Sequence, residues 1–341
     1  MRKLVTIQEV REIVPIPEAD SIEVVKIMGW QCVAKKGEFK VGDKGVYFEV
    51  DSYLPIEERY EFLRGSSYRN NEFMGEGFRI KTMRMRGQLS QGLFLPFSNY
   101  PELDLGSKDI GEDITVLLGV RKWEIPEVEG SSGTIIGDKP FGIPTTDELR
   151  VQSTELLREK MLGKPYYIST KMDGTSCTMY HKGNKVGVCG RNTEYKDDEN
   201  CSMWKYAHKH NIPDKLKHYG KNIAIQGEFC GHGIQKNRLK LNEPAFYVFD
   251  IINLDTHERA GYHELMSITS ELGLNTVPIE EVGECFNYTL EELLEKARGK
   301  YPSGLDKEGI VIRPIVPEYV RELSTKLSFK VINNDFLLKE K

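Results

Sequence analysis

The stretch Pro165-Tyr166-Tyr167-Ile168-Ser169-Thr170-Lys171-Met172-Asp173-Gly174 joins a strand-like apolar run to a Lys-x-Asp-Gly turn. Asp-Gly is a common turn dipeptide, so the tetrapeptide alone predicts no more than an exposed turn. The run before it places Lys171 at the end of a β-strand. Charged and aromatic residues at the ends of further predicted strands follow in the sequence. Their order, taken together with Lys171, indicates a functional role for this stretch more strongly than any one of them does alone.

The composition is that of a soluble globular protein. The chain has 341 residues, of which 39% are hydrophobic and 29% charged, and this length suffices for two domains with their own cores. It contains no run of about 18 apolar residues that could span a membrane. Charged residues interrupt the N-terminus too early for a signal peptide. We therefore expect no membrane segment and a cytoplasmic or nuclear location.

Cysteine spacing and net charge narrow the possible sites. The six cysteines form no Cys-x-x-Cys pair, which argues against a zinc site and favours reduced thiols in an intracellular protein. The net charge is -5, so any contact with nucleic acid must come from local basic patches.

The chain is predicted to hold two domains and a linker. Residues 1–125 are mostly β: Val46 to Asp51 alternates apolar and polar residues, and short strands with frequent Gly turns favour a small barrel. A Gly/Pro/Ser-rich linker is expected at 126–140. Residues 141–341 should form a mixed α and β domain, so the fold class is α+β.

Capping signals and apolar runs locate the elements of the second domain. Thr145 with Glu148 fits a capping box and predicts a helix that runs to Met161, and Thr289 with Glu292 predicts a second helix. Apolar runs between them predict strands at 166–169, 223–226, 246–252, 310–315 and 327–332.

Carboxylates flank two of the predicted strands. Glu228 ends the first of these strands and Glu308 precedes the other. A carboxylate at the end of a buried strand is costly unless it has a partner. With Asp173, the two could hold the waters of Mg²⁺ or Mn²⁺ bound to phosphate oxygens. Taken singly, Glu228 could also mark an ordinary strand end, and a solvated turn is the better explanation of Glu308.

Three further parts of the sequence suit nucleotide chemistry: Arg191, Phe249 and the segment 325–331. The guanidinium of Arg191 could hold a ribose hydroxyl or a phosphate oxygen. Phe249 could stack on a purine, although most aromatics of its strand are expected to pack in the core. If residues 325–331 are extended, Lys326, Ser328 and Lys330 share a face, and a lysine there would stabilise the charge on a transferring phosphate.

The order Lys171, Arg191, Glu228, Phe249, Glu308, Lys330 resembles the collinear motifs of the covalent nucleotidyltransferase superfamily, which includes ATP-dependent DNA ligases, RNA ligases and mRNA capping enzymes. The resemblance implies an adenylyltransferase domain of antiparallel sheets with flanking helices, and Lys171 as the nucleophile that carries AMP. It implies an ATP site that comprises Asp173, Gly174, Arg191, Glu228, Phe249, Glu308 and Lys330, with Lys326 as a further phosphate contact.

Domain order resembles one branch of the superfamily. Only 11 residues follow Lys330, so a C-terminal OB domain of the kind found in DNA ligases and capping enzymes is not expected. A β-rich domain comes first, as in ATP-dependent RNA ligases with an N-terminal OB-fold domain. The chain departs from this pattern at Ser328, where such enzymes usually have a lysine. RNA contacts are expected from Arg79, Lys81, Arg84, Arg86, Lys236 and Arg238.

The expected activity is ATP-dependent joining of a 3′-hydroxyl to a 5′-phosphate through lysyl-AMP and an adenylylated 5′ end. The RNA partner expected from the resemblance is a nicked duplex with an RNA 3′-hydroxyl strand, in RNA repair, and no obligate protein partner is evident. The alternatives are a DNA ligase, a capping-type enzyme, or an inactive nucleic-acid-binding protein. Mg²⁺ and Mn²⁺ suit the site equally.

Overall fold

The computed structural model describes residues 2–124 and 133–339, and it divides into two compact units. The first unit comprises residues up to 124 with two short segments, at 152–155 and from Leu337 onward. The second comprises 133–151 and 156–336. The predicted linker at 126–140 lies partly outside the described residues, so the predicted domain bounds stay a prediction.

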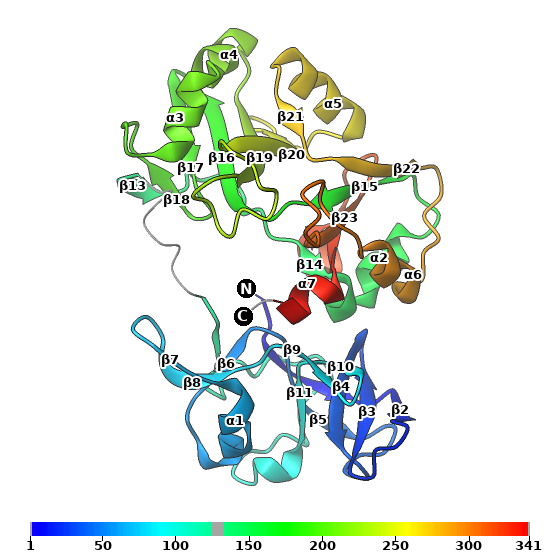
Figure 1. The fold of residues 1–341 in the computed structure, drawn as a ribbon. Coiled ribbons are helices and arrows are strands. Elements are labelled where there is room, and N and C mark those ends of the chain that lie inside the picture. The colour runs from blue at the N-terminus through cyan, green and yellow to red at the C-terminus, as the bar shows by residue number, and fades with distance from the viewer. Residues whose placement is uncertain (1, 125–132, 340–341) are drawn as a thin grey trace. The chain divides into compact units, whose positions relative to one another are not determined.

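The first unit consists mainly of strands, as predicted (Figure 1). Three sheets carry most of it, with strand orders β1-β5-β11, β2-β3-β4 and β12-β6-β8-β7, and β9 and β10 form a hairpin. The strands are β1 (Val5–Glu9), β2 (Glu12–Pro15), β3 (Ile22–Ile27), β4 (Trp30–Lys35), β5 (Lys44–Phe48), β6 (Ser52–Leu54), β7 (Tyr68–Asn71), β8 (Gly75–Arg79), β9 (Thr82–Met85), β10 (Gln88–Gln91), β11 (Leu93–Pro96) and β12 (Arg121–Lys122).

The strand β5 is buried on both faces. Val46 and Phe48 pack in one apolar core of the first unit, whereas Tyr47 packs in a second core with Trp30. The predicted strand is therefore present, but its alternation does not mark a solvent-exposed face. A short helix, α1 (Arg64–Ser67), and two 3₁₀ turns, η1 (Glu58–Leu63) and η2 (Phe97–Asn99), complete the regular structure described in this unit.

Two sheets form the second unit. The larger has the order β13-β18-β17-β16-β19-β20-β21 and the smaller β14-β26-β23-β15-β22. The larger contains β13 (Ile135–Asp138), β16 (Thr175–Lys182), β17 (Lys185–Cys189), β18 (Thr193–Tyr195), β19 (Ile223–Cys230), β20 (Ala245–Asn253) and β21 (Asn275–Thr276). The smaller contains β14 (Leu149–Arg150), β15 (Tyr166–Lys171), β22 (Ile279–Gly283), β23 (Gly309–Pro314) and β26 (Phe329–Ile332), and a separate pair is formed by β24 (Tyr319–Val320) and β25 (Thr325–Lys326).

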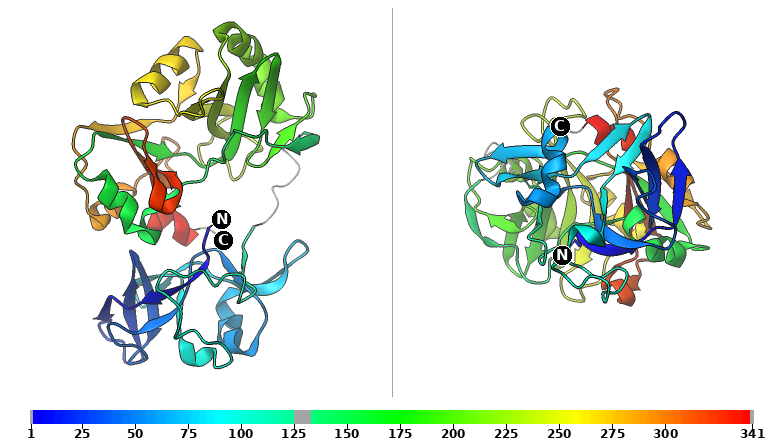
Figure 2. Two further views of the ribbon diagram at one scale, coloured as in Figure 1. Left: turned by 180° about the vertical axis from the view of Figure 1, so that it is seen from behind. Right: turned by 90° about the horizontal axis from the view of Figure 1, so that it is seen from below.

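Helices cover one face of each of these sheets (Figures 1 and 2). The helices α3 (Ser202–Lys209), α4 (Ile212–Tyr219) and α5 (Tyr262–Glu271) pack on the apolar face of the larger sheet, where Ile225 and Val248 lie in their core. The helices α2 (Glu155–Met161) and α6 (Leu290–Lys296) pack on the smaller sheet against Ile168 and Ile312. The last helix is α7 (Asn334–Lys339). This packing leaves the other face of each sheet for polar groups.

One predicted helix start is wrong and the other is confirmed. The capping box of Thr289 and Glu292 begins α6, with both of its hydrogen bonds present. The helix expected after Thr145 begins only at Glu155, because Glu148 is buried in ion pairs with Arg313 and Lys326. Residues 149–150 then pair with β26 as the strand β14. A buried ion pair and a strand ladder outweigh a local capping signal.

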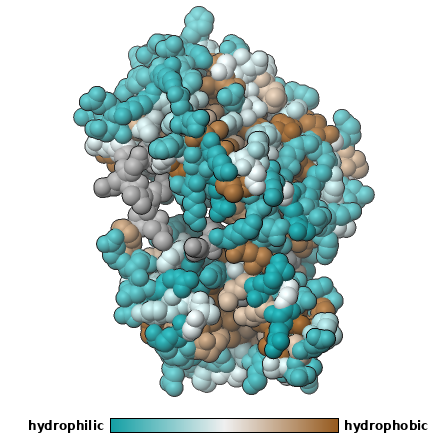
Figure 3. All heavy atoms as spheres, viewed as in Figure 1, coloured by the Kyte–Doolittle hydropathy of each residue, from teal (hydrophilic) through white to brown (hydrophobic). Residues whose placement is uncertain are grey.

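The surface drawn in Figure 3 is mainly hydrophilic, with hydrophobic residues in small scattered groups. Among the described residues, none of the helices combines the length and the apolar character needed to cross a membrane.

Candidate active site

The polar faces of the two sheets of the second unit turn toward each other. Residues paired across a ladder share a face, so the pairs Tyr167–Arg313, Lys171–Gly309 and Val311–Lys330 place these side chains on the face of the smaller sheet opposite its helices. Contacts reach from this face to the larger sheet: Arg313 lies 5.6 Å from the ring centroid of Phe249. The candidate site lies between these faces.

Lys171 ends β15 and forms an ion pair with Glu308. The distance from Lys171 Nζ to Glu308 Oε2 is 2.6 Å, and the two side chains are 22% and 19% exposed. Burial alone would lower the pKa of Lys171, but the carboxylates of Glu308 and Glu228 outweigh it and raise that pKa. The amine is therefore protonated at neutral pH, and a reaction at Nζ requires that it first lose a proton.

The turn after Lys171 carries the strand from one sheet to the other. Asp173 Oδ2 lies 3.1 Å from Arg238 Nε, and Gly174 leads into β16. A Cβ on Gly174 would lie 2.5 Å from the carbonyl oxygen of Phe229 and 2.6 Å from Cys230 Sγ. Only glycine fits there, because the turn presses against β19. The Asp-Gly pair is thus required by close packing, beyond its general preference for turns.

Glu228 lies on β19, where it pairs with Ser176 of β16. Burial is the main cause that raises the pKa of Glu228 to about 8; Lys171 opposes it, and the nearby charges of Glu308 and Asp173 act in the same direction as burial. The group thus holds three carboxyl groups, and Lys171 and Arg238 are the cations that pair with two of them, Glu308 and Asp173. With its raised pKa, Glu228 is mostly protonated near neutral pH, and a divalent cation bound beside it would favour its ionised form.

In the ranges 2–124 and 133–339, no three His, Cys, Asp or Glu side chains are close enough to hold one ion together. Contact of Asp173, Glu228 and Glu308 with a cation through water molecules stays a prediction from the sequence.

Phe249 is the extra residue of a β-bulge. Gln226 pairs with Asp250, whereas the next residue, Gly227, pairs with Val248, so Phe249 is left without a counterpart on β19. Its ring lies near Arg313 and belongs to an apolar cluster that includes Met172 and Tyr301. The bulge therefore gives the predicted stacking residue a position beside the motif of Lys171.

A buried charge network adjoins Phe249. Lys326 Nζ lies 2.7 Å from Glu148 Oε1 and 3.7 Å from Asp250 Oδ2, and Arg313 also pairs with Glu148 at 2.8 Å. Burial lowers the pKa of Lys326 to about 8 against the opposing effect of Glu148. Lys326, Ser328, Arg313 and Asp250 line one pocket. Lys326 thus faces this pocket, with Glu148 as its ion-pair partner.

The segment that carries Lys326 and Lys330 is not one continuous strand. β25 ends at Lys326 and β26 begins at Phe329, and the amide of Ser328 donates to the carbonyl of Lys326 at 2.9 Å. Lys330 lies on β26, on the same sheet face as Lys171, and Arg150 of β14 pairs with it. Lys330 and Arg150 therefore lie side by side at the edge of the site in this sheet.

Arg191 forms an ion pair with Asp147, in the segment that precedes β14. Its guanidinium forms two hydrogen bonds to Asp147, at 2.7 and 2.9 Å, and both side chains are about half exposed. The contact ties the turn after β17 to the segment that leads into Glu148. A role of Arg191 in binding the nucleotide stays a prediction.

The residues predicted to contact RNA fall into three groups. Arg79 is buried, lies 5.1 Å from the ring centroid of Trp123 and forms an ion pair with Asp51. Lys81 is half-buried, and burial with the charges of Arg69 and Arg79 lowers its pKa. Arg84, Arg86 and Lys236 are exposed, whereas Arg238 is only partly exposed and faces inward.

Several residues of the site were not predicted from the sequence. Glu148 and Arg313 join the charge network, Arg150 lies beside Lys330, and Tyr301 touches the backbone of Lys171. Only Arg313 carries a usable signal: it is the one charged residue in the apolar run after Glu308, and strand periodicity places it on the same face as Val311. Glu148, Arg150 and Tyr301 reach the site through contacts with residues that are far away in the sequence.

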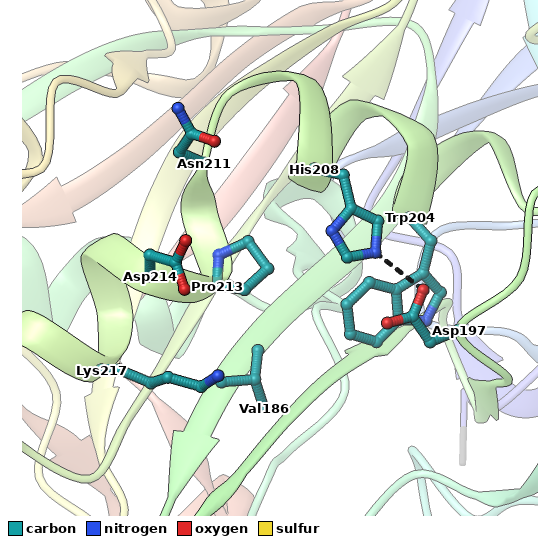
Figure 4. A pocket seen from close by; sticks show the side chains of 8 residues that line it. All are labelled: Val186, Asp197, Trp204, His208, Asn211, Pro213, Asp214 and Lys217. Carbon is teal, nitrogen blue, oxygen red and sulfur yellow. Dashed lines mark hydrogen bonds and ion pairs between the residues drawn. The ribbon is translucent and has the colours of Figure 1, made fainter.

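A second pocket lies on the helical side of the larger sheet, beside α3 and α4 (Figure 4). His208 stacks on Trp204 there and pairs with Asp197 at 2.7 Å. None of the predicted site residues lines it: the lining consists of Val186, Asp197, Trp204, His208, Asn211, Pro213, Asp214 and Lys217. It is separate from the carboxylate group around Lys171.

Comparison with known proteins identifies the family. Residues 4–97 match the model of an OB-fold domain and residues 164–332 match the model of the RNA ligase family, which confirms the predicted fold class of both parts. No curated protein matches the chain. Solved structures do match it over nearly its whole length, and those of an RNA ligase from Naegleria gruberi are among them.

Three of these Naegleria gruberi structures show the extent of the likeness. A mutant with ATP and Mn and a mutant with AMP and Mn are each 38% identical, with 99% of both chains covered and a TM-score of 0.91. A structure with PPi is 39% identical, covers 100% of this chain and 99% of its own, and has a TM-score of 0.91. The chain belongs to the RNA ligase family.

Proposed function

We propose that this chain is an ATP-dependent RNA ligase that joins a 3′-hydroxyl to a 5′-phosphate through lysyl-AMP on Lys171. The observation that carries the proposal is the Lys171–Glu308 ion pair of 2.6 Å, set among the carboxylates of Glu228 and Asp173. A lysine amine fixed among carboxylates at a strand end is suited to attack a phosphate that arrives with a divalent cation.

The reaction proceeds in three steps, the first two at the α-phosphate that comes from ATP and the third at the 5′-phosphate of the RNA. Lys171 Nζ attacks the α-phosphate of ATP, the bond to pyrophosphate breaks, and AMP stays on Nζ. The RNA 5′-phosphate then attacks this AMP, which frees Lys171 and leaves a 5′-5′ pyrophosphate on the RNA. Finally, the 3′-hydroxyl attacks the RNA phosphate of that linkage, its proton leaves, and AMP departs as the strands join.

The residues of the site have distinct parts in these transfers. Glu308 Oε2 lies where it can accept the proton that Lys171 Nζ must lose. Asp173, Glu228 and Glu308 would hold Mg²⁺ or Mn²⁺ through water, and the ion would neutralise charge on the phosphate oxygens. Lys330 and Lys326 would stabilise the charge of the transferring phosphate. Phe249 would stack on the adenine.

The RNA substrate proposed is a nicked duplex with an RNA strand at the 3′-hydroxyl side, and the role is RNA repair. The support is the exposed basic hairpin of β9 and β10 with Arg84 and Arg86. All six cysteines are free thiols, which supports the cytoplasmic or nuclear location expected from the sequence.

The test is covalent labelling with α-labelled ATP, with GTP in parallel, followed by a denaturing gel of wild type and Lys171→Ala. We expect label from ATP on the wild type and none on the variant. Label from GTP would indicate a capping-type enzyme, and the absence of any label on folded protein with Mn²⁺ would leave a nucleic-acid-binding protein. Competing nicks with RNA or DNA 3′ strands then test the substrate.

A further inference from the structure

A tyrosine outside the predicted motifs joins the end of β15, at Lys171, to Glu308, which immediately precedes β23. The hydroxyl of Tyr301 donates to the carbonyl oxygen of Lys171 at 2.7 Å and accepts from the amide of Glu308 at 3.0 Å. The ladder between β15 and β23 has its last pair at Lys171 and Gly309. The hydroxyl therefore links the two strands just beyond the end of that ladder.

Burial keeps the phenol of Tyr301 protonated, so that its hydroxyl acts as the donor to Lys171. Tyr301 is 4% exposed, and burial raises the pKa of its phenol, so the hydroxyl keeps the proton that it donates to Lys171. Both bonds go to main-chain atoms. They fix the backbone from which the Lys171 and Glu308 side chains extend, and those side chains meet at 2.6 Å. A phenylalanine at 301 would leave both main-chain groups without this partner.

A carboxylate makes a second link one residue earlier on each strand. Glu280 of β22 accepts from the hydroxyl of Thr170 at 2.7 Å and from Lys307 Nζ at 2.7 Å. Thr170 precedes Lys171 and Lys307 precedes Glu308. The same two segments are thus linked twice: Tyr301, from a loop, bonds their main-chain atoms, and Glu280, from β22, bonds their side chains.

The loop that carries Tyr301 is itself closed at its base. The amide of Lys307 donates to the carbonyl of Gly299 at 3.0 Å, and the amide of Tyr301 donates to the carbonyl of Leu305 at 2.8 Å. Ser303 Oγ donates to the carbonyl of Arg238 at 2.6 Å, and Arg238 holds Asp173. Residues 299–307 therefore contact the backbone of the site at three places: Lys171, Glu308 and Arg238.

We propose that Tyr301 is a positioning residue for the transfer of AMP to Lys171: its hydroxyl holds the backbone of the nucleophile in register with that of Glu308. This inference rests on the proposed function. Tyr301 touches neither reacting atom, and it acts through the placement of Lys171. A small displacement of a nucleophile costs rate far more than it costs substrate affinity.

The test is Tyr301→Phe, which removes only the hydroxyl. In single-turnover labelling at saturating ATP, the rate of lysyl-AMP formation should fall roughly 10- to 100-fold, while the KM for ATP changes by less than about threefold. Joining of pre-adenylylated RNA bypasses attack by Lys171, so its rate should fall by less than about threefold. A thermal melt of each variant checks the fold.

Tyr288→Phe is the matched control, because its hydroxyl donates to Glu281 at 2.7 Å in the same unit without touching the strand ends. Equal losses in the two variants, or equal losses with ATP and with pre-adenylylated RNA, would overturn the inference. If Tyr301→Phe does not fold, Glu280→Gln should show the same selective loss, and its absence would be equally decisive. A wild type that forms no lysyl-AMP would instead refute the proposed function.

Discussion

The Nε atom of Arg238 lies 3.1 Å from Asp173 Oδ2, with 12% and 17% of the two side chains exposed. The guanidinium also lies 4.2 Å from the ring centroid of Phe336. An arginine predicted to contact RNA is therefore a partner of the aspartate that follows the nucleophile. Its loop includes left-handed backbone at Gln235 and Asn237, with φ of 47° and 42°, a conformation that costs energy and is common at functional sites.

Arg238→Ala should impair the chemistry more than RNA binding. Removing the guanidinium leaves Asp173 in a largely buried place without this cation, and we expect lysyl-AMP formation to slow about 10- to 100-fold. The control is Lys236→Ala, two residues away and exposed, which should label at the wild-type rate. Normal labelling by Arg238→Ala together with lost RNA affinity would restore the RNA-contact interpretation.

The elements predicted well from sequence are those whose signal is local. Apolar runs located β15, β19, β20 and β23, and the carboxylates at strand ends, Glu228 and Glu308, meet Lys171 because their strands lie in two facing sheets. Strand periodicity determines on which face of a sheet a residue lies, and the order of the motifs then indicates which strand ends meet at the site.

The residues missed depend on contacts between distant parts of the chain. Tyr301 and Lys171 are 130 positions apart, and Glu148 and Arg313 are 165 apart. Nothing near Tyr301 distinguishes it from a tyrosine of an ordinary loop. At Glu148 the local capping signal even pointed to a helix, and the buried ion pairs that prevent it become visible only in the folded structure.

Loss of a carboxylate should raise the metal requirement. Glu228→Gln and Glu308→Gln each remove a carboxyl group that can ionise beside a bound cation, so less attraction remains for a divalent cation. We expect the Mg²⁺ concentration that gives half-maximal lysyl-AMP formation to rise at least about tenfold. The exposed variant Glu159→Gln is the control. An unchanged metal titration in both variants would show that the ion is bound elsewhere, and chelation of metal should abolish labelling of the wild type.

Glu148 should make stability depend on pH in the acid range. Burial opposes its ionisation, but Lys326 and Arg313 outweigh burial and lower the pKa of Glu148 from 4.5 to about 2. A carboxylate with a lowered folded-state pKa stabilises the protein above pH 4.5, and this contribution is lost as the pH falls toward 2. It amounts to about 3 kcal/mol at neutral pH.

Urea unfolding of Glu148→Gln against wild type measures this contribution. The difference in free energy of unfolding should be largest near neutral pH and should shrink as the pH is lowered below 4.5. Glu159→Gln, at an exposed position of α2, should leave the free energy of unfolding within about 0.5 kcal/mol of wild type. A difference for Glu148→Gln that stays constant with pH would contradict the assignment of this ion pair.

Gly309 should tolerate no side chain. Its φ is +151°, and a Cβ there would lie 2.1 Å from the carbonyl oxygen of Val331. Gly309→Ala should therefore destabilise the protein by at least about 3 kcal/mol, because the β23 backbone must move away from β26. Gly304 also has a positive φ, +83°, but nothing lies within 4 Å of its Cβ position. Gly304→Ala should cost only about 1 kcal/mol, and equal costs by thermal unfolding would refute the clash.

The hairpin of β9 and β10 should bind RNA through phosphates rather than bases. Arg84 and Arg86 are exposed near its turn, where Arg86 has a φ of 46° and Gly87 a φ of 79°. Replacing either arginine with alanine should weaken RNA binding equally for unrelated sequences. Each should also reduce the slope of log affinity against log salt by about 1. Label transfer from ATP to Lys171 should remain normal, since neither arginine belongs to the second unit. A salt slope equal to that of the wild type would place the RNA on another surface.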